Sequence, residues 1–220
     1  MSLVSRFMQG ELKLARVEAF SDGVFAIAIT LLGLTLKVPK LSDSSLLDAL
    51  AREWPSFLAF VTSFATIGIV WINHHRLFTH IRRVSHGLLM WNGLLLMAVS
   101  LIPFTTELVA AYIGRDGATE AAMVYAASQM FVTLAFNLLW RHVTRRKRLV
   151  DLHIKAPAVR RINLQYRFGP LLYLVSLFVA FASALASVVL DVAFTAFFAL
   201  PAFAVADAGR TIKDLDEASS

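Results

Sequence analysis

Residues 16–36 contain an Arg, a Ser and an Asp at the start of a segment that is otherwise apolar enough to cross a bilayer (RVEAFSDGVFAIAITLLGLTL). At about 1.5 Å per residue this segment forms a helix of roughly 31 Å, close to the thickness of the hydrocarbon core. An Asp at a helix centre costs about 2.5–3.5 kcal/mol on insertion scales, and less near an end. Asp22 lies about two turns in, so it requires a polar partner and marks the first helix as a candidate functional element.

The composition of the chain is that of a membrane protein. Of its 220 residues, 58% are hydrophobic and 16% are charged, whereas a soluble domain carries about 25% charged residues. The apolar segments are continuous and do not alternate with period two, which favours helices over a β-barrel. The chain has no cysteine, which excludes disulfides and thiolate metal sites. These features predict an all-α membrane protein.

The hydropathy pattern predicts six transmembrane helices. The expected spans are residues 16–36, 56–78, 87–112, 121–141, 168–188 and 192–207. The last two could form one long helix, but Asp191 lies between them, and a charge belongs at the interface rather than in mid-bilayer. We therefore expect a tight hairpin there. Residues 1–15 and 208–220 are expected to be cytoplasmic, flanking a transmembrane domain at 16–207.

Basic residues set the expected orientation. With six spans both termini share one side, which carries 17 of the Lys and Arg residues, against 4 on the other side. The positive-inside rule then makes both termini cytoplasmic. The same bias explains the basic run RRKR at 145–148, so we expect it to be a topology signal and no nucleic acid to be a partner.

Polar residues of three spans are expected to meet at one depth near the inner leaflet. The first span runs outward and the second returns, so FSD (20–22) lies level with WINHH (71–75), and the third span brings Asn92 to the same layer. Buried polar groups in lipid need partners, which these residues can supply to one another. The predicted network comprises Arg16, Phe20, Ser21, Asp22, Trp71, Asn73, His74, His75 and Asn92.

Two interpretations of this network stay open. It could be a hydrogen-bonded clasp that locks the first three spans together, or a proton relay or gating element, because His titrates near neutral pH. Adjacent His74 and His75 point about 100° apart on a helix, and no carboxylate stands at ligand spacing beside them, so no metal site is predicted. Motifs of hydrolases, proteases and nucleotide-binding enzymes are absent, which argues against an enzyme.

Beyond Asp22 the first span is a candidate pore wall. Ile27, Leu31 and Leu34 recur at intervals of four and three residues and share one face, with Thr30 beside them. Such a stripe is also typical of ordinary packing. A hydrophobic constriction that gates by dewetting would require the same residues on the axis of an oligomer.

The chain resembles the transmembrane protein 175 family of endolysosomal potassium channels and their bacterial relatives. Residues 16–22 match the R-x-x-x-F-S-D signature of the family's first helix. The likeness continues through GVFAIAITLL (23–32), WINHH (71–75) and WNGLLLMAVSLIPFTTEL (91–108), which together span roughly half of the chain.

This resemblance implies a six-helix subunit without a re-entrant pore loop, and a homotetramer in a bacterial inner membrane whose first helices line a central pore. By position, the family's isoleucine constriction falls on Ile27, with Thr30, Leu31 and Leu34 on or near the pore face further out. The implied permeant ion is potassium, with modest selectivity over sodium, and no cofactor is implied. The expected partners are three further copies of the chain, membrane lipids and monovalent cations.

An alternative function is a proton-coupled secondary transporter or a proton leak in which Asp22 and His74 or His75 relay protons. Such transporters are expected to contain discontinuous helices and a structural repeat related to the first. Neither feature is evident in this sequence.

Overall fold

The computed structural model describes residues 3–39, 45–79, 81–145 and 156–198, and describes side chains at 13–39, 45–79, 81–145 and 168–198. The described part is helical almost throughout. The helices are α1 (Leu3–Gly33), α2 (Leu46–Arg52), α3 (Trp54–Phe78), α4 (His86–Ser100), α5 (Ile102–Tyr112), α6 (Ala118–Arg145) and α7 (Ala156–Ala182), followed by an unlabelled helix at Ala184–Phe198.

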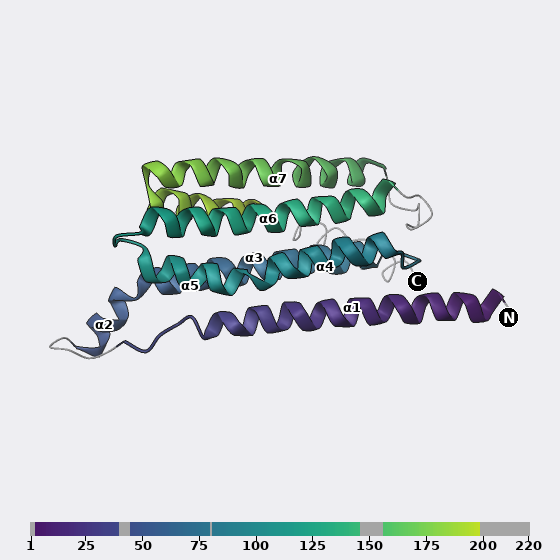
Figure 1. The fold of residues 1–220 in the computed structure, drawn as a ribbon, viewed down its shortest axis with the longest axis horizontal. Coiled ribbons are helices and arrows are strands. Elements are labelled where there is room, and N and C mark those ends of the chain that lie inside the picture. Colours follow the sequence, from purple (N-terminus) through teal and green to yellow (C-terminus); the bar gives the residue numbers. More distant parts are fainter. Residues whose placement is uncertain (1–2, 40–44, 80, 146–155, 199–220) are drawn as a thin grey trace, which may run out of the picture.

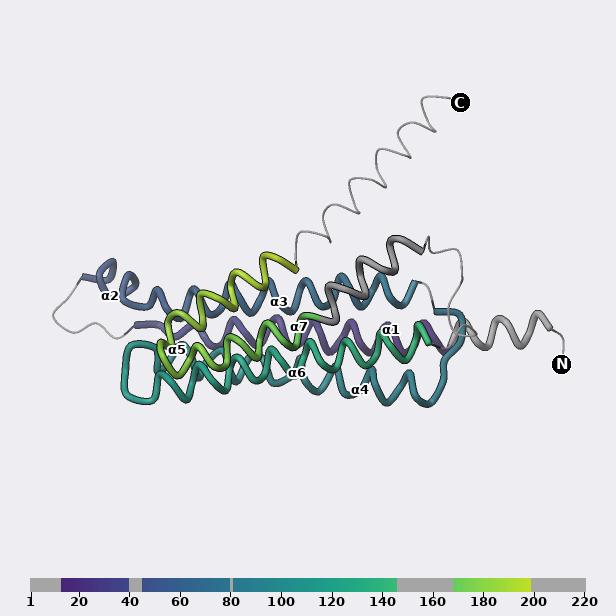
Figure 2. Tube along the Cα trace, turned by 90° about the horizontal axis from the view of Figure 1, so that it is seen from above, coloured from purple at the N-terminus to yellow at the C-terminus, as the bar shows by residue number. Residues whose placement is uncertain are grey.

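The long helices lie side by side and alternate in direction along the chain (Figures 1 and 2). In Figure 1, α1 forms one edge, α3, α4 and α5 form the middle layer, and α6 and α7 form the opposite edge. α1 contacts α3, α4 and α5, whereas α6 contacts α4, α5 and α7. Among the described residues, α1 is therefore packed on one side only.

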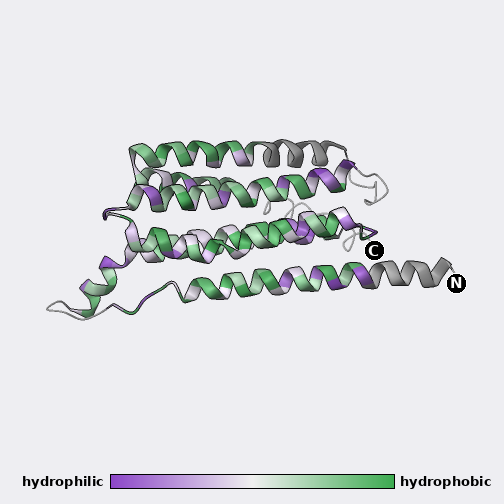
Figure 3. Ribbon diagram, viewed as in Figure 1, coloured by the Kyte–Doolittle hydropathy of each residue, from purple (hydrophilic) through white to green (hydrophobic). Residues whose placement is uncertain are grey.

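Three helical segments in the described part are long and apolar enough to cross a membrane: α3, the combined α4–α5 segment at His86–Tyr112, and α6. Phe168–Ala182 and Ala184–Phe198 are apolar but shorter. Figure 3 shows hydrophobic residues along most of these helices. In α1, the hydrophilic residues are concentrated in the N-terminal half of the part that is coloured. The prediction of an all-α membrane protein is confirmed at this level.

Local sequence explains where several helices begin. The hydroxyls of Ser45 and Ser85 accept hydrogen bonds from backbone amides three residues ahead, which caps the N-termini of α2 and α4. The expected span at 87–112 is divided into α4 and α5 at Leu101. Pro103 follows this junction, and a proline has no amide hydrogen to continue the ladder of the preceding turn.

The prediction of a hairpin at Asp191 is wrong. The chain turns at Ser183, and Asp191 lies within the helix Ala184–Phe198 with only 1% of its surface exposed. The Ser183 hydroxyl accepts a hydrogen bond from the amide of Ala186 at 3.2 Å, and this N-cap starts the new helix at Ala184, seven residues before Asp191. The later part of the expected sixth span, residues 199–207, lies outside the described residues.

The main apolar core joins the middle layer to α1 and α6. Phe25 and Leu32 of α1 belong to the same buried cluster as Ile67 of α3, Leu95 of α4 and Leu139 of α6. These contacts bury one face of α1, and so decide which face remains exposed.

Candidate functional site

α1 has one buried and one exposed face, both following the helical period. Ser21, Phe25, Ala28 and Leu32 are between 0% and 2% exposed. The intervals of four, three and four residues keep them on one side of the helix, which packs against α3 and α4. This face attaches α1 to its own subunit.

The opposite face presents the residues that the sequence proposes for the pore. Ile27 is 60% exposed, Leu31 43% and Leu34 78%. Thr30 is also exposed, but its hydroxyl donates to the Ile27 carbonyl at 2.9 Å. α1 ends at Gly33, so Leu34 lies in the turn that follows the helix. The rest of the described chain thus leaves a row of large apolar side chains uncovered.

A buried hydrogen-bond chain attaches the inner face of α1 to α3 and α4. Asn92 donates through Nδ2 to the Ser21 hydroxyl at 2.9 Å, and its Oδ1 lies 2.8 Å from Nε2 of His74. The Ser21 hydroxyl in turn donates to the Val17 carbonyl at 2.9 Å. Because the Ser21 proton is used there, Asn92 must offer its amide nitrogen to Ser21, and its oxygen therefore faces His74.

Because the Asn92 oxygen can only accept a hydrogen bond, the ring proton of His74 is on Nε2, which donates to Asn92. The ring lies between Phe25 and Phe78, with centroid distances of 5.3 and 4.2 Å. Nδ1 is buried and has no hydrogen-bond partner among the described residues. A second proton on Nδ1 would have no acceptor in that part of the chain, so the geometry favours the clasp over a relay through this ring.

A second, more exposed layer connects α1 to α3. Trp71 donates through Nε1 to Oδ1 of Asp22 at 2.9 Å, and Nδ1 of His75 lies 3.0 Å from Oε1 of Glu18. The rings of Trp71 and His75 stack with centroids 6.1 Å apart. Sequence reasoning did not include Glu18, although it lies four residues before Asp22 and therefore on the same helix face.

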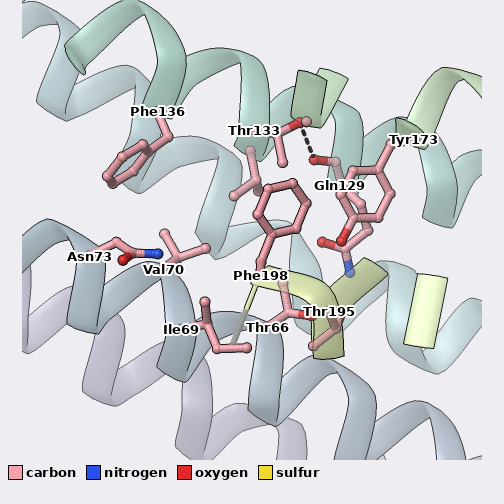
Figure 4. Close-up of a pocket in the computed structure, with 12 residues that line it drawn as sticks. Thr66, Ile69, Val70, Asn73, Gln129, Thr133, Phe136, Tyr173, Thr195 and Phe198 are labelled. Carbon is pink, nitrogen blue, oxygen red and sulfur yellow. Dashed lines mark hydrogen bonds between the residues drawn. The ribbon is translucent and has the colours of Figure 1, made fainter. Parts of the chain in front are cut away.

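Three residues of the expected network lie elsewhere. Phe20 is 67% exposed, and Arg16 is exposed without a hydrogen bond or ion pair to the network residues described. Asn73 lies on another face of α3 and lines a cavity against α6 (Figure 4). At about 100° per residue, Asn73 lies roughly 200° around the helix from Trp71, whereas His74 and His75 lie within roughly 60° of Trp71. The structure brings together Ser21, Asp22, Trp71, His74, His75 and Asn92.

Sequence reasoning also missed a second set of buried hydroxyls on the far side of α3. Ser63 accepts from Thr106 at 2.7 Å and lies 3.0 Å from the Tyr125 hydroxyl. Thr66 pairs with Thr195 at 2.9 Å. The available signal was the run of Thr and Ser at intervals of three and four in the second span, which marks a polar helix face.

Comparison with known proteins reproduces the resemblance seen in the signature motifs. The family described as "Endosomal/lysosomal potassium channel TMEM175" matches residues 16–103. A potassium channel of Chamaesiphon minutus is 46% identical over 188 residues, which cover 84% of this chain and 93% of that protein. A potassium channel of Streptomyces collinus is 46% identical over 171 residues, which cover 77% and 83% of the two chains.

A solved structure has the same fold. The crystal structure of a protein described as a lysosomal potassium-selective channel TMEM175 homolog from Chamaesiphon minutus superposes with a TM-score of 0.78 at 45% sequence identity. The match covers 86% of this chain and 98% of that one. These relatives are channels and not enzymes, in agreement with the expectation from the motifs.

Proposed function

The chain belongs to the TMEM175 family, and on this premise we propose that it is a potassium-permeable cation channel whose α1 helices line a central pore. Four copies of the subunit form the channel. Each contributes six spans within residues 16–207, and both termini, at 1–15 and 208–220, lie on the cytoplasmic side of a bacterial inner membrane.

The observation that carries this proposal is the uncovered apolar row on α1. Ile27, Leu31 and Leu34 are between 43% and 78% exposed in a single subunit, although neighbouring residues of the same helix are fully buried. Four copies packed around an axis would bring these rows to face one another across a narrow conduit. The signature residues then orient the helix, and the apolar row forms the pore wall.

A ring of Ile27 side chains would act as a hydrophobic gate. Branched apolar side chains offer water and ions no hydrogen bonds, so a narrow ring of them closes by dewetting. Leu31 and Leu34 would add further apolar levels towards the outer end. The Thr30 hydroxyl donates its proton to the Ile27 carbonyl, and its oxygen keeps lone pairs that can contact a passing ion.

Selectivity in such a pore is modest. The proposed constriction provides apolar side chains and no ring of backbone carbonyls, so it cannot replace the hydration shell of an ion. The preference for potassium over sodium then arises from the cost of removing part of that shell in a narrow apolar passage. Sodium holds its water more strongly and is therefore disfavoured.

The absence of native cysteine allows a direct test of the pore position. Ile27→Cys introduces a single thiol, and Val61→Cys on α3 is a matched control because Val61 is 59% exposed, close to the 60% of Ile27. In liposomes loaded with potassium, a charged methanethiosulfonate reagent should alter flux through the Ile27→Cys channel and leave the Val61→Cys channel unchanged. An oxidant should cross-link Ile27→Cys subunits with each other.

Failure of both modification and cross-linking at position 27 would overturn the pore assignment. Single-channel recording separates the channel from the alternative proton-coupled transporter. Unitary currents far above the turnover of a transporter support the channel, whereas slow, proton-dependent flux without such currents supports the transporter.

A further inference from the structure

Asp191 is a buried carboxylate in a part of the subunit away from α1. It lies on the helix Ala184–Phe198 and is 1% exposed. Neither Oδ1 nor Oδ2 has a hydrogen-bond partner among the described residues. The Ser176 hydroxyl approaches the carboxylate closely enough to be a candidate hydrogen-bond donor to it. However, this hydroxyl donates to the Ser187 carbonyl at 3.1 Å and lies 2.9 Å from the Ser187 hydroxyl, so its proton is already used.

The residues one turn away from Asp191 show that α7 covers this helix face. Ser187, four residues before Asp191, pairs with Ser176 of α7. Phe194, three residues after Asp191, packs edge-on against the ring of Tyr173 of α7 at 5.6 Å. Residues at these spacings share a face with Asp191, so its carboxylate is enclosed on the α7 side.

The same face also reaches α6 and α3. Val188, three residues before Asp191, packs with Tyr125 of α6 in a small apolar cluster. Thr195, four residues after Asp191, pairs with Thr66 of α3 at 2.9 Å. Asp191 therefore lies where α3, α6, α7 and its own helix converge.

Gln129 supplies a third acceptor without a partner near this point. It lies one turn after Tyr125 on α6, is 1% exposed, and its Oε1 has no hydrogen-bond partner among the described residues. Gln129, Thr195 and Tyr173 line a cavity of about 50 Å³ (Figure 4). The space that the centre of one water molecule occupies is about 10–15 Å³, so the cavity can hold a few water molecules.

We propose that Asp191 and Gln129 form a binding site for a partly hydrated monovalent metal cation, K⁺ or Na⁺, inside each subunit. A buried carboxylate needs a compensating positive charge. The described groups around it are hydroxyls, an amide and aromatic rings, none of them cationic. Hard cations take oxygen ligands, and carboxylate, amide and hydroxyl oxygens are the groups that converge here.

A metal cation and a proton would compensate the charge of Asp191 in different ways. A proton neutralises the group, and the remaining acceptor atoms can then accept hydrogen bonds from water in the cavity. A cation keeps the carboxylate ionised and can take ligands from the carboxylate, from Gln129 Oε1 and from those waters, so only a cation makes the stability of the site depend on K⁺ or Na⁺. No group of three His, Cys, Asp or Glu side chains occurs in the described residues, which argues against a transition metal here.

Thermal unfolding of the purified full-length protein tests the site through the binding of K⁺ and Na⁺. A ligand that binds only the folded state raises Tm with its concentration. The wild-type Tm should be a few degrees higher in KCl or NaCl than in N-methylglucamine chloride at the same ionic strength. Asp191→Asn should abolish this difference. Asp116→Asn, which removes an exposed carboxylate from the loop after α5, should retain it.

Crystals soaked in a thallium salt give a second, direct readout. Anomalous density beside Asp191 in the wild-type protein supports the site, and its loss in Asp191→Asn assigns it to this carboxylate. A wild-type Tm independent of cation type, together with no thallium density near Asp191, would overturn the proposal and indicate a protonated carboxyl group. Either result leaves the pore proposal intact, because modification at Ile27 and potassium flux test a different helix.

Discussion

Nε2 of His74 lies 2.8 Å from Oδ1 of Asn92, and this buried contact joins α3 to α4 at the depth where α1 presents Ser21. Because Asn92 also donates to Ser21 at 2.9 Å, one amide side chain connects three helices. The position of α1 relative to the rest of the subunit therefore depends on a polar contact as well as on apolar packing.

Replacing Asn92 with Ala should destabilise the subunit. The change leaves the buried Nε2–H of His74 without its acceptor, and an unsatisfied buried group costs about 1–3 kcal/mol. Asn73→Ala is the matched control, because Asn73 is only half-buried and lies outside the network. The measurement is the free energy of unfolding in detergent micelles. Equal stability of the two variants would contradict the assigned role of Asn92.

Asp22→Ala should weaken assembly more than it weakens the fold. The lost bond from Trp71 is partly exposed, so the subunit should lose only about 0.5–1.5 kcal/mol, but α1 would no longer be held at a fixed rotation. Trp71→Phe removes the same hydrogen bond and should have the same effect, whereas Asp116→Ala should have none. Native mass spectrometry of the purified variants measures the fraction of tetramer. Full tetramer in both network variants would show that the Asp22–Trp71 contact is dispensable.

Ile27→Asn should raise conductance and lower the preference for potassium over sodium. A polar amide in the constriction would hydrate it and reduce the dehydration cost that separates the two ions. Val61→Asn, at an equally exposed apolar position on α3, is the control for the effect of a polar substitution. The measurement is the reversal potential under bi-ionic conditions in planar bilayers. A permeability ratio that does not change would place the constriction elsewhere.

Gly87→Ala should destabilise the contact between α4 and α6. A Cβ at this position would overlap Cε1 of the His142 ring and lie 2.7 Å from its Nε2, so the ring must move. Overpacking of this kind typically costs about 1–3 kcal/mol. Gly93→Ala on the same helix meets no atom within 4 Å and should be neutral or stabilising in the isolated subunit. Thermal unfolding of the two variants in detergent compares them, and an equal Tm would refute the steric argument.

Much of the fold follows from patterns that act locally. Continuous apolar segments predict membrane helices because backbone amides in lipid must bond within their own segment. The positions of α3, α6 and the joined α4–α5 segment agree with the expected spans to within a few residues. In the structure Ser21, Asp22, Trp71, His74, His75 and Asn92 lie at one depth, where antiparallel helices of similar length pair their ends.

The sequence by itself determined the class of the protein, the helical segments and the layer in which their polar residues meet, because these depend on hydropathy, helix rise and motif spacing. Only the tertiary structure decided which side of each helix is covered. It turned Asn73 away from the network, brought Glu18 into it, and enclosed Asp191 between four helices where an interfacial charge was expected. The physical reason is that burial depends on the rotation of each helix about its axis. That rotation is set by packing between residues far apart in the chain, and the hydropathy of a mostly apolar sequence does not determine it.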